Sequence, residues 1–298
     1  MTTFKDKYIN PFTDFGFKKL FGTEPNKDLL IDFLNEVVLP KERKILDLTY
    51  SNNERTARSK SDRKAIFDLY CIGKNGERFI VEMQKAKQNY FKDRSVYYAS
   101  FPIQEQGLKG KWDFKLSEVY TVGVLDFVFS EDKDEKMVRH EVKLKDQNCK
   151  VFYDKLTFIY LEMPHFIKTE EELETTYDKW LYVLKYLPEL EKRPKKLQEK
   201  IFEKLFRAAE IAKFTPAELV EYEDSLKQYR DLKNVIDTSH SDGKIEGKIE
   251  GKIEGKIEGK IEGIISALEM GTLSVEVIAQ IFKESVEYIL KIKQENNL

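Results

Sequence analysis

The chain has 298 residues, and 41% of them are hydrophobic, so it can bury a full core as one large domain or two smaller ones. The 51 Lys and Arg nearly balance the 53 Asp and Glu, which leaves a formal net charge of −2. The net charge therefore does not indicate nucleic-acid binding, and any contact with nucleic acid must depend on a local group of basic residues.

Hydropathy and cysteine usage narrow the class of protein further. No stretch approaches the roughly 18 apolar residues of a membrane span, and the start of the chain lacks a signal-peptide pattern. We therefore expect a cytoplasmic protein that does not bind membranes. Cys71 and Cys149 offer neither a disulfide framework nor zinc-ligand spacing, so both are predicted to be free thiols.

The first 165 residues alternate between helical and strand patterns. Apolar spacing predicts helices in NPFTDFGFKKLFG and KDLLIDFLNEVV, and strands in KILDLTYS, KAIFDLYCIG and ERFIVEMQ, with GKNG as the tight turn of a hairpin. A helix over 91–109, shortened or kinked by Pro102, and a buried strand in EVYTVGVLDFVF complete an αβββαβ order. Two more strands, around 138–144 and 156–162, extend the sheet, so the pattern predicts an α/β layered domain.

Beyond Pro164 the sequence consists of charged amphipathic segments. Aromatic and leucine residues recur there at helical intervals, which predicts a helical region over 166–240 whose apolar faces pack on each other or on the sheet. Residues 264–298 are predicted to form a tail of short helices, with Gly271 as a C-cap and Ser274 and Ser285 as N-caps. The tail has a helix-turn-helix pattern, but few basic residues lie where a recognition helix needs them, so a packing or oligomerisation module is favoured.

Residues 243–262 are five consecutive copies of GKIE. In a helix this repeat places Lys over Lys and Glu over Glu at i,i+4, where like charges repel, and each Gly costs about 1 kcal/mol relative to Ala. Residues 241–263 are therefore predicted to be a flexible or conditionally helical linker. The isoleucine stripe of the repeat would gain stability by self-association, so a homo-oligomer formed through the repeat and the tail is an open alternative.

Two acids and an amide are placed together by the predicted hairpin. Asp68 lies among apolar residues, where an ionised carboxylate is costly unless it is paired or binds a cation. Glu82 and Gln84 are two residues apart on the facing strand, so both side chains point to one face. These hard oxygen donors suit Mg²⁺ or another divalent cation and the hydrolysis of phosphodiesters. By spacing alone, however, an acid on a strand more commonly faces solvent than a metal.

The hairpin resembles the active-site hairpin of the PD-(D/E)XK superfamily, in the branch of Rpn-like recombination-promoting nucleases and PD-(D/E)XK nuclease family transposases. Ordered blocks along nearly the whole chain carry the resemblance: NPFTDFGFKKLFG, DLYCIGKNGERFIVEMQ, RSVYYAS, EQGLKGKWDFKLSEVYTVGVLDF, DKWLYVLKYL and YEDSLKQYRDLKNVI. The resemblance implies a restriction-endonuclease-like αβββαβ core with a mixed sheet in residues 1–165. It also implies a Mg²⁺-dependent DNA endonuclease linked to recombination or mobile elements.

Carried over to this chain, the resemblance implies that Asp68 and Glu82 hold the metal and that Gln84 is the third catalytic position. The superfamily often has lysine there. Gln84 cannot supply that positive charge, but its amide can orient water or help to coordinate the metal. Asp14 corresponds to the N-terminal acid of the family and would approach the site from the first helix. A role as a helix N-cap explains Asp14 equally well.

Basic residues near the hairpin are candidates for contact with DNA phosphates. Lys85 and Lys87 directly follow the second hairpin strand, and Arg94 lies on the next helix. Lys18 and Lys19 are weaker candidates, because exposed lysines on helices are usually only solvated.

Other polar residues give weaker signals. Tyr98 and Gln106 match the family pattern and are expected to line a surface that faces DNA or the site. Packing explains Tyr98 equally well. His140, His165 and His240 are too far apart in sequence and pattern to predict a metal or nucleophile site.

Two rival functions come from other classes of protein. A catalytically weak DNA-binding or partner-binding protein that keeps the nuclease fold is motivated by the missing lysine and the near-neutral charge. Self-association through the GKIE repeat and the tail is a third possible principal role.

Overall fold

The computed structural model describes residues 6–39, 44–51, 54–55, 65–107, 113–129 and 136–298. The chain divides into two compact units, Met1–Lys233 and Asn234–Leu298, and each is described by itself below. No helix in the described part of the chain is long and apolar enough to cross a membrane.

Helices make up most of the described chain. The α-helices are α1 (Asp14–Phe21), α2 (Lys27–Val37), α3 (Phe91–Glu105), α4 (Thr176–Tyr186), α5 (Lys200–Ala209), α6 (Pro216–Glu269), α7 (Val275–Phe282) and α8 (Val286–Glu295). Short 3₁₀ turns are η1 (Glu24–Asn26), η2 (Met163–His165), η3 (Leu187–Glu189) and η4 (Ile211–Lys213).

The first unit contains a six-stranded mixed sheet with the order β1-β4-β5-β6-β8-β7. Its strands are β1 (Leu48–Tyr50), β4 (Leu69–Gly73), β5 (Arg78–Gln84), β6 (Val119–Leu125), β7 (Arg139–Lys145) and β8 (Val151–Glu162). The β5–β6 and β6–β8 pairs are parallel and the others are antiparallel. Two residues each of β2 (Glu54–Arg55) and β3 (Ala65–Ile66) form a separate antiparallel pair.

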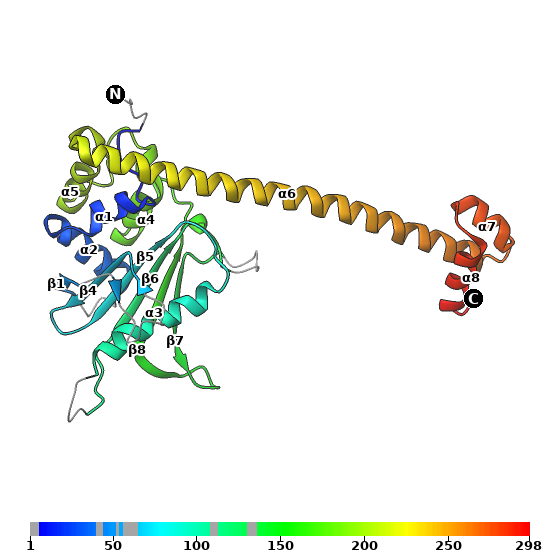
Figure 1. The fold of residues 1–298 in the computed structure, drawn as a ribbon, viewed down its shortest axis with the longest axis horizontal. Helices are drawn as coiled ribbons and strands as arrows, with labels where there is room; N and C mark the ends of the chain where they lie inside the picture. The colour runs from blue at the N-terminus through cyan, green and yellow to red at the C-terminus, as the bar shows by residue number, and fades with distance from the viewer. Residues whose placement is uncertain (1–5, 40–43, 52–53, 56–64, 108–112, 130–135) are drawn as a thin grey trace. The chain divides into compact units, whose positions relative to one another are not determined.

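Helices cover both faces of the sheet (Figure 1). One face carries Val81, Val122 and Ile159, which belong to the main core together with buried residues of α1, α2, α4 and α5. Residues of the opposite face, such as Ile80 and Tyr160, lie in two smaller clusters with side chains of α3. Because successive residues of a strand point to opposite faces, the near-continuous apolar runs of β5, β6 and β8 are what a sheet covered on both faces requires.

The helices after residue 165 pack into the same core as the N-terminal helices. Trp180 of α4 is fully buried, packs edge-on against Phe33 and tilted against Phe202, and donates its indole N–H to Asp32 at 2.7 Å. Residues before and after position 165 share this core. The predicted division of the chain at residues 165 and 240 remains a prediction.

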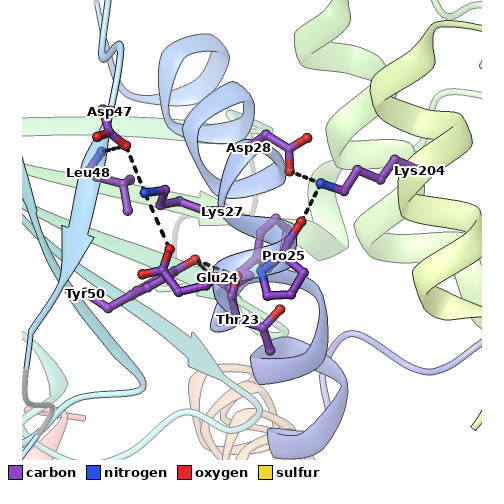
Figure 2. Close-up of polar contacts among 10 residues, drawn as sticks. Thr23, Glu24, Pro25, Lys27, Asp28, Asp47, Leu48, Tyr50 and Lys204 are labelled. Carbon is purple, nitrogen blue, oxygen red and sulfur yellow. Dashed lines mark hydrogen bonds and ion pairs between the residues drawn. The ribbon is translucent and has the colours of Figure 1, made fainter.

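A group of polar contacts fixes the connection between α1 and α2 (Figure 2). Tyr50 of β1 donates its hydroxyl to the carbonyl of Phe21 at 2.5 Å. Lys27 reaches Asp47 at 3.0 Å. Lys204 of α5 binds both Asp28 and the carbonyl of Pro25. The end of α1 is therefore held against the sheet and against α5.

The second unit has its own small core. Ile264 at the end of α6, Ile278 of α7 and Ile289 of α8 are buried together. Ser274 and Ser285 accept hydrogen bonds from Val277 N and Tyr288 N, as predicted for N-caps. Gly271 has φ +62° just beyond α6, which confirms its predicted role at a helix end.

The GKIE repeat is helical in the structure, as part of α6. This differs from the flexible linker expected from its glycines and agrees with the helical alternative. Each end of α6 belongs to a packed core, through Tyr222 in the first unit and Ile264 in the second. Packing near each end stabilises the helix there, and this offsets the poor local propensity of the repeat.

The structure also corrects two element boundaries. The predicted strand KAIFDLYCIG is divided, because the chain bends at Asp68 between β3 and β4. The helix predicted over 91–109 ends at Glu105 and continues through Pro102. The other predicted strands and both N-terminal helices are present, and the GKNG turn closes with Gly76 at φ +91°.

Candidate active site

Asp68 and Glu82 meet at the end of the β4–β5 hairpin. Leu69 pairs with Val81, so the next pair along the antiparallel ladder sets Asp68 opposite Glu82. The Asp68 N–H donates to Glu82 Oε1 at 3.3 Å, and the Met83 N–H donates to Asp68 Oδ2 at 2.7 Å. These bonds to side chains replace ladder bonds, and this is why the predicted strand breaks at Asp68.

Burial makes this acid pair costly to ionise. Glu82 is only 8% exposed, and burial, followed by the charge of Asp68, raises its pKa to about 8. Burial also raises the pKa of Asp68, and the Met83 hydrogen bond opposes that rise. Two adjacent buried carboxyl groups with raised pKa values are typical of functional sites rather than of structural ion pairs.

Gln84 links the acids to Arg94 of α3. An Arg94 NH donates to Gln84 Oε1 at 2.7 Å, and Gln84 Nε2 donates to Glu82 Oε2 at 3.0 Å. A guanidinium can only donate and an ionised carboxylate can only accept, so the two partners fix the orientation of the amide. The amide oxygen of Gln84, expected to face water or metal, is therefore engaged by Arg94.

Packing holds the guanidinium of Arg94 in place. It lies 5.5 Å from the ring centre of Phe91 and 5.6 Å from that of Tyr98, and it also binds Gln88. Arg94 is thus a positioned cation beside Glu82, and its charge lowers the pKa of that carboxyl against the larger effect of burial. Its predicted contact with DNA phosphate remains a prediction.

Helix α1 brings further charges to the other side of the acids. Asp14 pairs with Lys18 at 2.9 Å, and its charge raises the pKa of Asp68. Burial lowers the pKa of Lys85, while the charges of Asp14 and Asp68 oppose that shift. The N-cap of α1 is Thr13, whose side chain accepts from Gly16 N, so the alternative of an N-cap role for Asp14 is wrong.

A cleft of about 730 Å³ opens next to this group of charges. It is lined by Asp14, Lys18 and Leu69 on one side and by residues of α6 such as Glu221 and Asp224 on the other. Leu69 is the residue directly after Asp68 in the chain, so the cleft reaches the strand that begins beside the acid pair.

The residues at the hairpin fit a divalent cation. Two buried carboxylates have the oxygen chemistry that Mg²⁺ prefers, and a cation would offset their repulsion. Beside Glu82, a cavity of about 10 Å³ is also lined by Thr121, whose buried hydroxyl has no hydrogen-bond partner among the described residues. In the described ranges no three or more His, Cys, Asp or Glu side chains group to hold a metal, so water or substrate oxygens would have to complete the shell.

Gly123 of β6 leaves room for the ring of Tyr160 beside Glu82. Gly123 and Glu82 pair across the parallel β5–β6 ladder, and both line the small cavity. A Cβ at position 123 would lie 3.0 Å from the ring of Tyr160, so a larger residue would push that ring.

Several predicted residues lie elsewhere or serve packing. Gln106 is buried and binds both the N–H and the carbonyl of Ser117, so its expected site-facing role is wrong. Tyr98 packs edge-on against Phe67 at 5.3 Å and also lines the small cavity beside Glu82. Lys87 is exposed.

The remaining candidate lysine on α1 is also paired. Lys19 forms an ion pair with Glu218 of α6 and lies over the ring of Phe214. Its contact with DNA phosphate remains a prediction.

Sequence reasoning missed another buried acid at the same edge of the sheet. Glu162 is 1% exposed and ends β8, in register with Leu125 and, through β6, with Gln84. His165 Nδ1 lies 3.1 Å from Glu162 Oε2, and His140 Nε2 lies 3.6 Å from it. The signal was present, since an acid follows an apolar run in FIYLE as it does in FIVE. His165 lies only three residues after Glu162, and only the contact with His140 depends on the order of the strands.

The fold is that of the restriction-endonuclease-like class of proteins, as the sequence predicts. The chain belongs to the family described as PD-(D/E)XK nuclease family transposase, whose model matches residues 11–239. Neither a curated protein nor a solved structure gave a significant match. The family assignment confirms the predicted fold class and supports a nuclease-like function.

Proposed function

We propose that the protein is a metal-dependent endonuclease that hydrolyses phosphodiester bonds in DNA. The observation that carries the proposal is the buried Asp68–Glu82 pair, held at the sheet edge and joined to Arg94 through Gln84. The proposed link to recombination or mobile elements rests on the description of the family as transposases.

Each residue has a distinct part in the proposed reaction. Asp68 and Glu82 would hold Mg²⁺ or another divalent cation, which when bound supplies Lewis-acid stabilisation and helps water to lose a proton. Gln84 fixes the Glu82 carboxylate through its amide N–H. In the overall reaction, the oxygen of water bonds to phosphorus and one P–O ester bond breaks, so the leaving oxygen takes up a proton.

Arg94 compensates for the lysine that Gln84 replaces. Its guanidinium lies one hydrogen bond from Gln84 and lowers the pKa of Glu82. A permanent positive charge at this position would stabilise the negative charge that develops on the phosphate. Lys85 is half-buried, and the charges of Asp14 and Asp68 act on it. It adds a second cation on the α1 side.

Nicking of supercoiled plasmid DNA tests the proposal. Wild-type protein should nick the plasmid with Mg²⁺ and not with EDTA, and Glu82→Ala should abolish the nicking. Glu191→Gln, at an exposed acid far along the chain from the hairpin, is the control and should keep full activity. Equal nicking by wild-type protein and Glu82→Ala would refute the proposed role of the site.

The second candidate function is binding of DNA or a partner without cleavage. The glutamine at position 84 favours it, because no lysine follows the second acid at that spacing. Binding of several DNA substrates without nicking in Mg²⁺ would support this candidate over the enzyme.

We also propose a homo-oligomer formed through the GKIE helix. Ile245, Ile249, Ile253 and Ile257 are between 50% and 56% exposed in the second unit. A stripe of half-exposed isoleucines on a helix is the kind of surface that self-association buries.

A further inference from the structure

Tyr90 is an exposed aromatic residue placed immediately before α3. Its side chain is 80% exposed, and it has no ring contact or hydrogen bond to another side chain in the part of the chain that the structure describes. Large aromatic side chains are usually at least partly buried, because exposing the ring forfeits its hydrophobic gain. Packing therefore does not explain this tyrosine.

The backbone of Tyr90 is also unusual. It occupies the N-cap position of α3 with φ 61° and ψ 28°, in the left-handed region, and its side chain makes no capping hydrogen bond. That position favours Ser, Thr, Asp, Asn or Gly, and the left-handed region favours Gly or Asn. Helix capping and turn formation therefore do not explain the residue either.

A short chain of hydrogen bonds ties Tyr90 to the acid pair. The Tyr90 carbonyl accepts from Arg94 N at 2.9 Å, and the side chain of Arg94 donates to Gln84 at 2.7 Å. Gln84 in turn donates to Glu82 at 3.0 Å. Tyr90 thus stands one helical turn from the residue that fixes the proposed catalytic amide.

Basic residues surround the exposed ring in sequence. Lys87 and Lys92 are both exposed, three residues before and two residues after Tyr90. An exposed aromatic ring between lysines is the combination that binds single-stranded nucleic acid, since a base stacks on the ring and the lysines follow the phosphates.

We propose that Tyr90 stacks on an unpaired base of the DNA next to the phosphodiester that is cut. The inference rests on the proposed nuclease function and names its substrate class, which is DNA with an unpaired or splayed nucleotide at the cleavage position. Stacking on Tyr90 requires the base to leave the duplex, and this costs least where the base is already unpaired. Tyr90 acts by binding the substrate, whereas Arg94 and Gln84 position the acids.

The experiment compares the affinity of the full-length protein for a splayed DNA junction and for the fully paired duplex, in EDTA so that no DNA is cut. The variants are Tyr90→Phe, Tyr90→Ala and Tyr90→Gly, and Gly at this position also relieves the positive φ. Phe152→Ala removes an equally exposed ring from β8 and is the control. Nicking of the splayed DNA in Mg²⁺ is measured in parallel.

The proposal predicts that wild-type protein, Tyr90→Phe and Phe152→Ala bind the splayed junction alike. Tyr90→Ala and Tyr90→Gly should both lose roughly tenfold in affinity for it, with little change for the duplex. Equal binding of the junction by wild-type protein and both truncated variants would overturn the proposal. If the wild-type protein nicks DNA but Tyr90→Ala and Tyr90→Gly bind and nick as it does, the stacking role is wrong and the proposed nuclease function is kept. If binding depends on Tyr90 but no protein nicks the DNA, the proposed nuclease function is wrong instead.

Discussion

At the residue scale, the buried acid pair that is proposed to bind the metal also lowers the stability of the hairpin when it is ionised. Glu82 is buried beside Asp68, so its ionised form lacks the solvation that it has in the unfolded chain. A carboxyl whose pKa is higher in the folded state supports folding below its ordinary pKa and loses that support as the pH rises. The hairpin therefore loses stability as the pH rises toward the pKa of Glu82, which is about 8.

The first prediction concerns Glu82→Gln in EDTA. The pKa of Glu82 is about 8, against an ordinary value of 4.5, so wild-type stability should fall as the pH rises from about 4.5 to 8. Glutamine keeps the shape without the charge, and the variant should be more stable at pH 8 by roughly 1–3 kcal/mol. At pH 4 the two proteins should unfold alike. Thermal unfolding at both pH values measures this, and a less stable variant at pH 8 would contradict it.

The second prediction concerns the charge at Arg94. Arg94→Ala should slow plasmid nicking by roughly 100-fold, as the loss of one preorganised donor does. Adding Gln84→Lys in the same protein should restore part of the rate, because lysine returns a cation beside Glu82. The single variant Gln84→Ala is the reference, since it removes the amide without adding charge. If the double variant is no faster than Arg94→Ala, the compensating role of Arg94 is wrong.

At the element scale, α6 shows how a helix forms in a sequence with poor local propensity. Five glycines recur at every fourth position of the repeat, and a Cβ at any of them would meet nothing within 4 Å. The space around these five positions therefore does not require glycine. Gly263, just after the repeat, differs because a Cβ would lie 2.8 Å from the ring of Phe282.

The third prediction contrasts these two kinds of glycine. Gly251→Ala with Gly255→Ala should stabilise the helix by about 1 kcal/mol per site and slow amide hydrogen exchange over residues 244–262. Gly263→Ala should instead loosen the contact with Phe282 and speed exchange in α7. Faster exchange in the repeat after the double substitution would contradict the account.

The positions of the strands and helices could be predicted from the sequence, because apolar residues recur with a different period in a strand and in a helix. The apolar runs of β4 and β5 and the GKNG turn predict the hairpin, and the hairpin brings Asp68 and Glu82 to one edge of the sheet. Contacts that depend on tertiary order could not be predicted. The Gln84–Arg94 bond joins a strand to a helix, and His140 meets Glu162 only because β7 and β8 are neighbours.

At the scale of the whole molecule, the charge pattern of the repeat favours one mode of self-association. In each GKIE unit, Lys and Glu lie about 100° to either side of Ile around the helix. A two-fold axis parallel to two facing helices brings the Lys flank of one against the Glu flank of the other, whereas an antiparallel pair sets like charges together. A parallel pair of chains is therefore expected, as in parallel coiled coils.

The fourth prediction tests that pairing. Ile249→Lys with Ile253→Lys should shift the protein toward the 35.1 kDa monomer in size-exclusion chromatography with light scattering, because it places charge in the apolar stripe. Gly251→Ala leaves the stripe intact and should keep the wild-type mass. A wild-type protein that is monomeric at high concentration would contradict the proposed homo-oligomer.

The central claim is that Asp68 and Glu82 together perform metal-dependent cleavage of DNA. The most direct measurement is the nicking rate of supercoiled plasmid in Mg²⁺ with the isosteric variants Asp68→Asn and Glu82→Gln. Both substitutions remove a costly buried charge while keeping side-chain shape, so the fold should persist. We predict that each variant stays folded and loses nicking by at least roughly 100-fold. Wild-type rates in both folded variants would contradict the account.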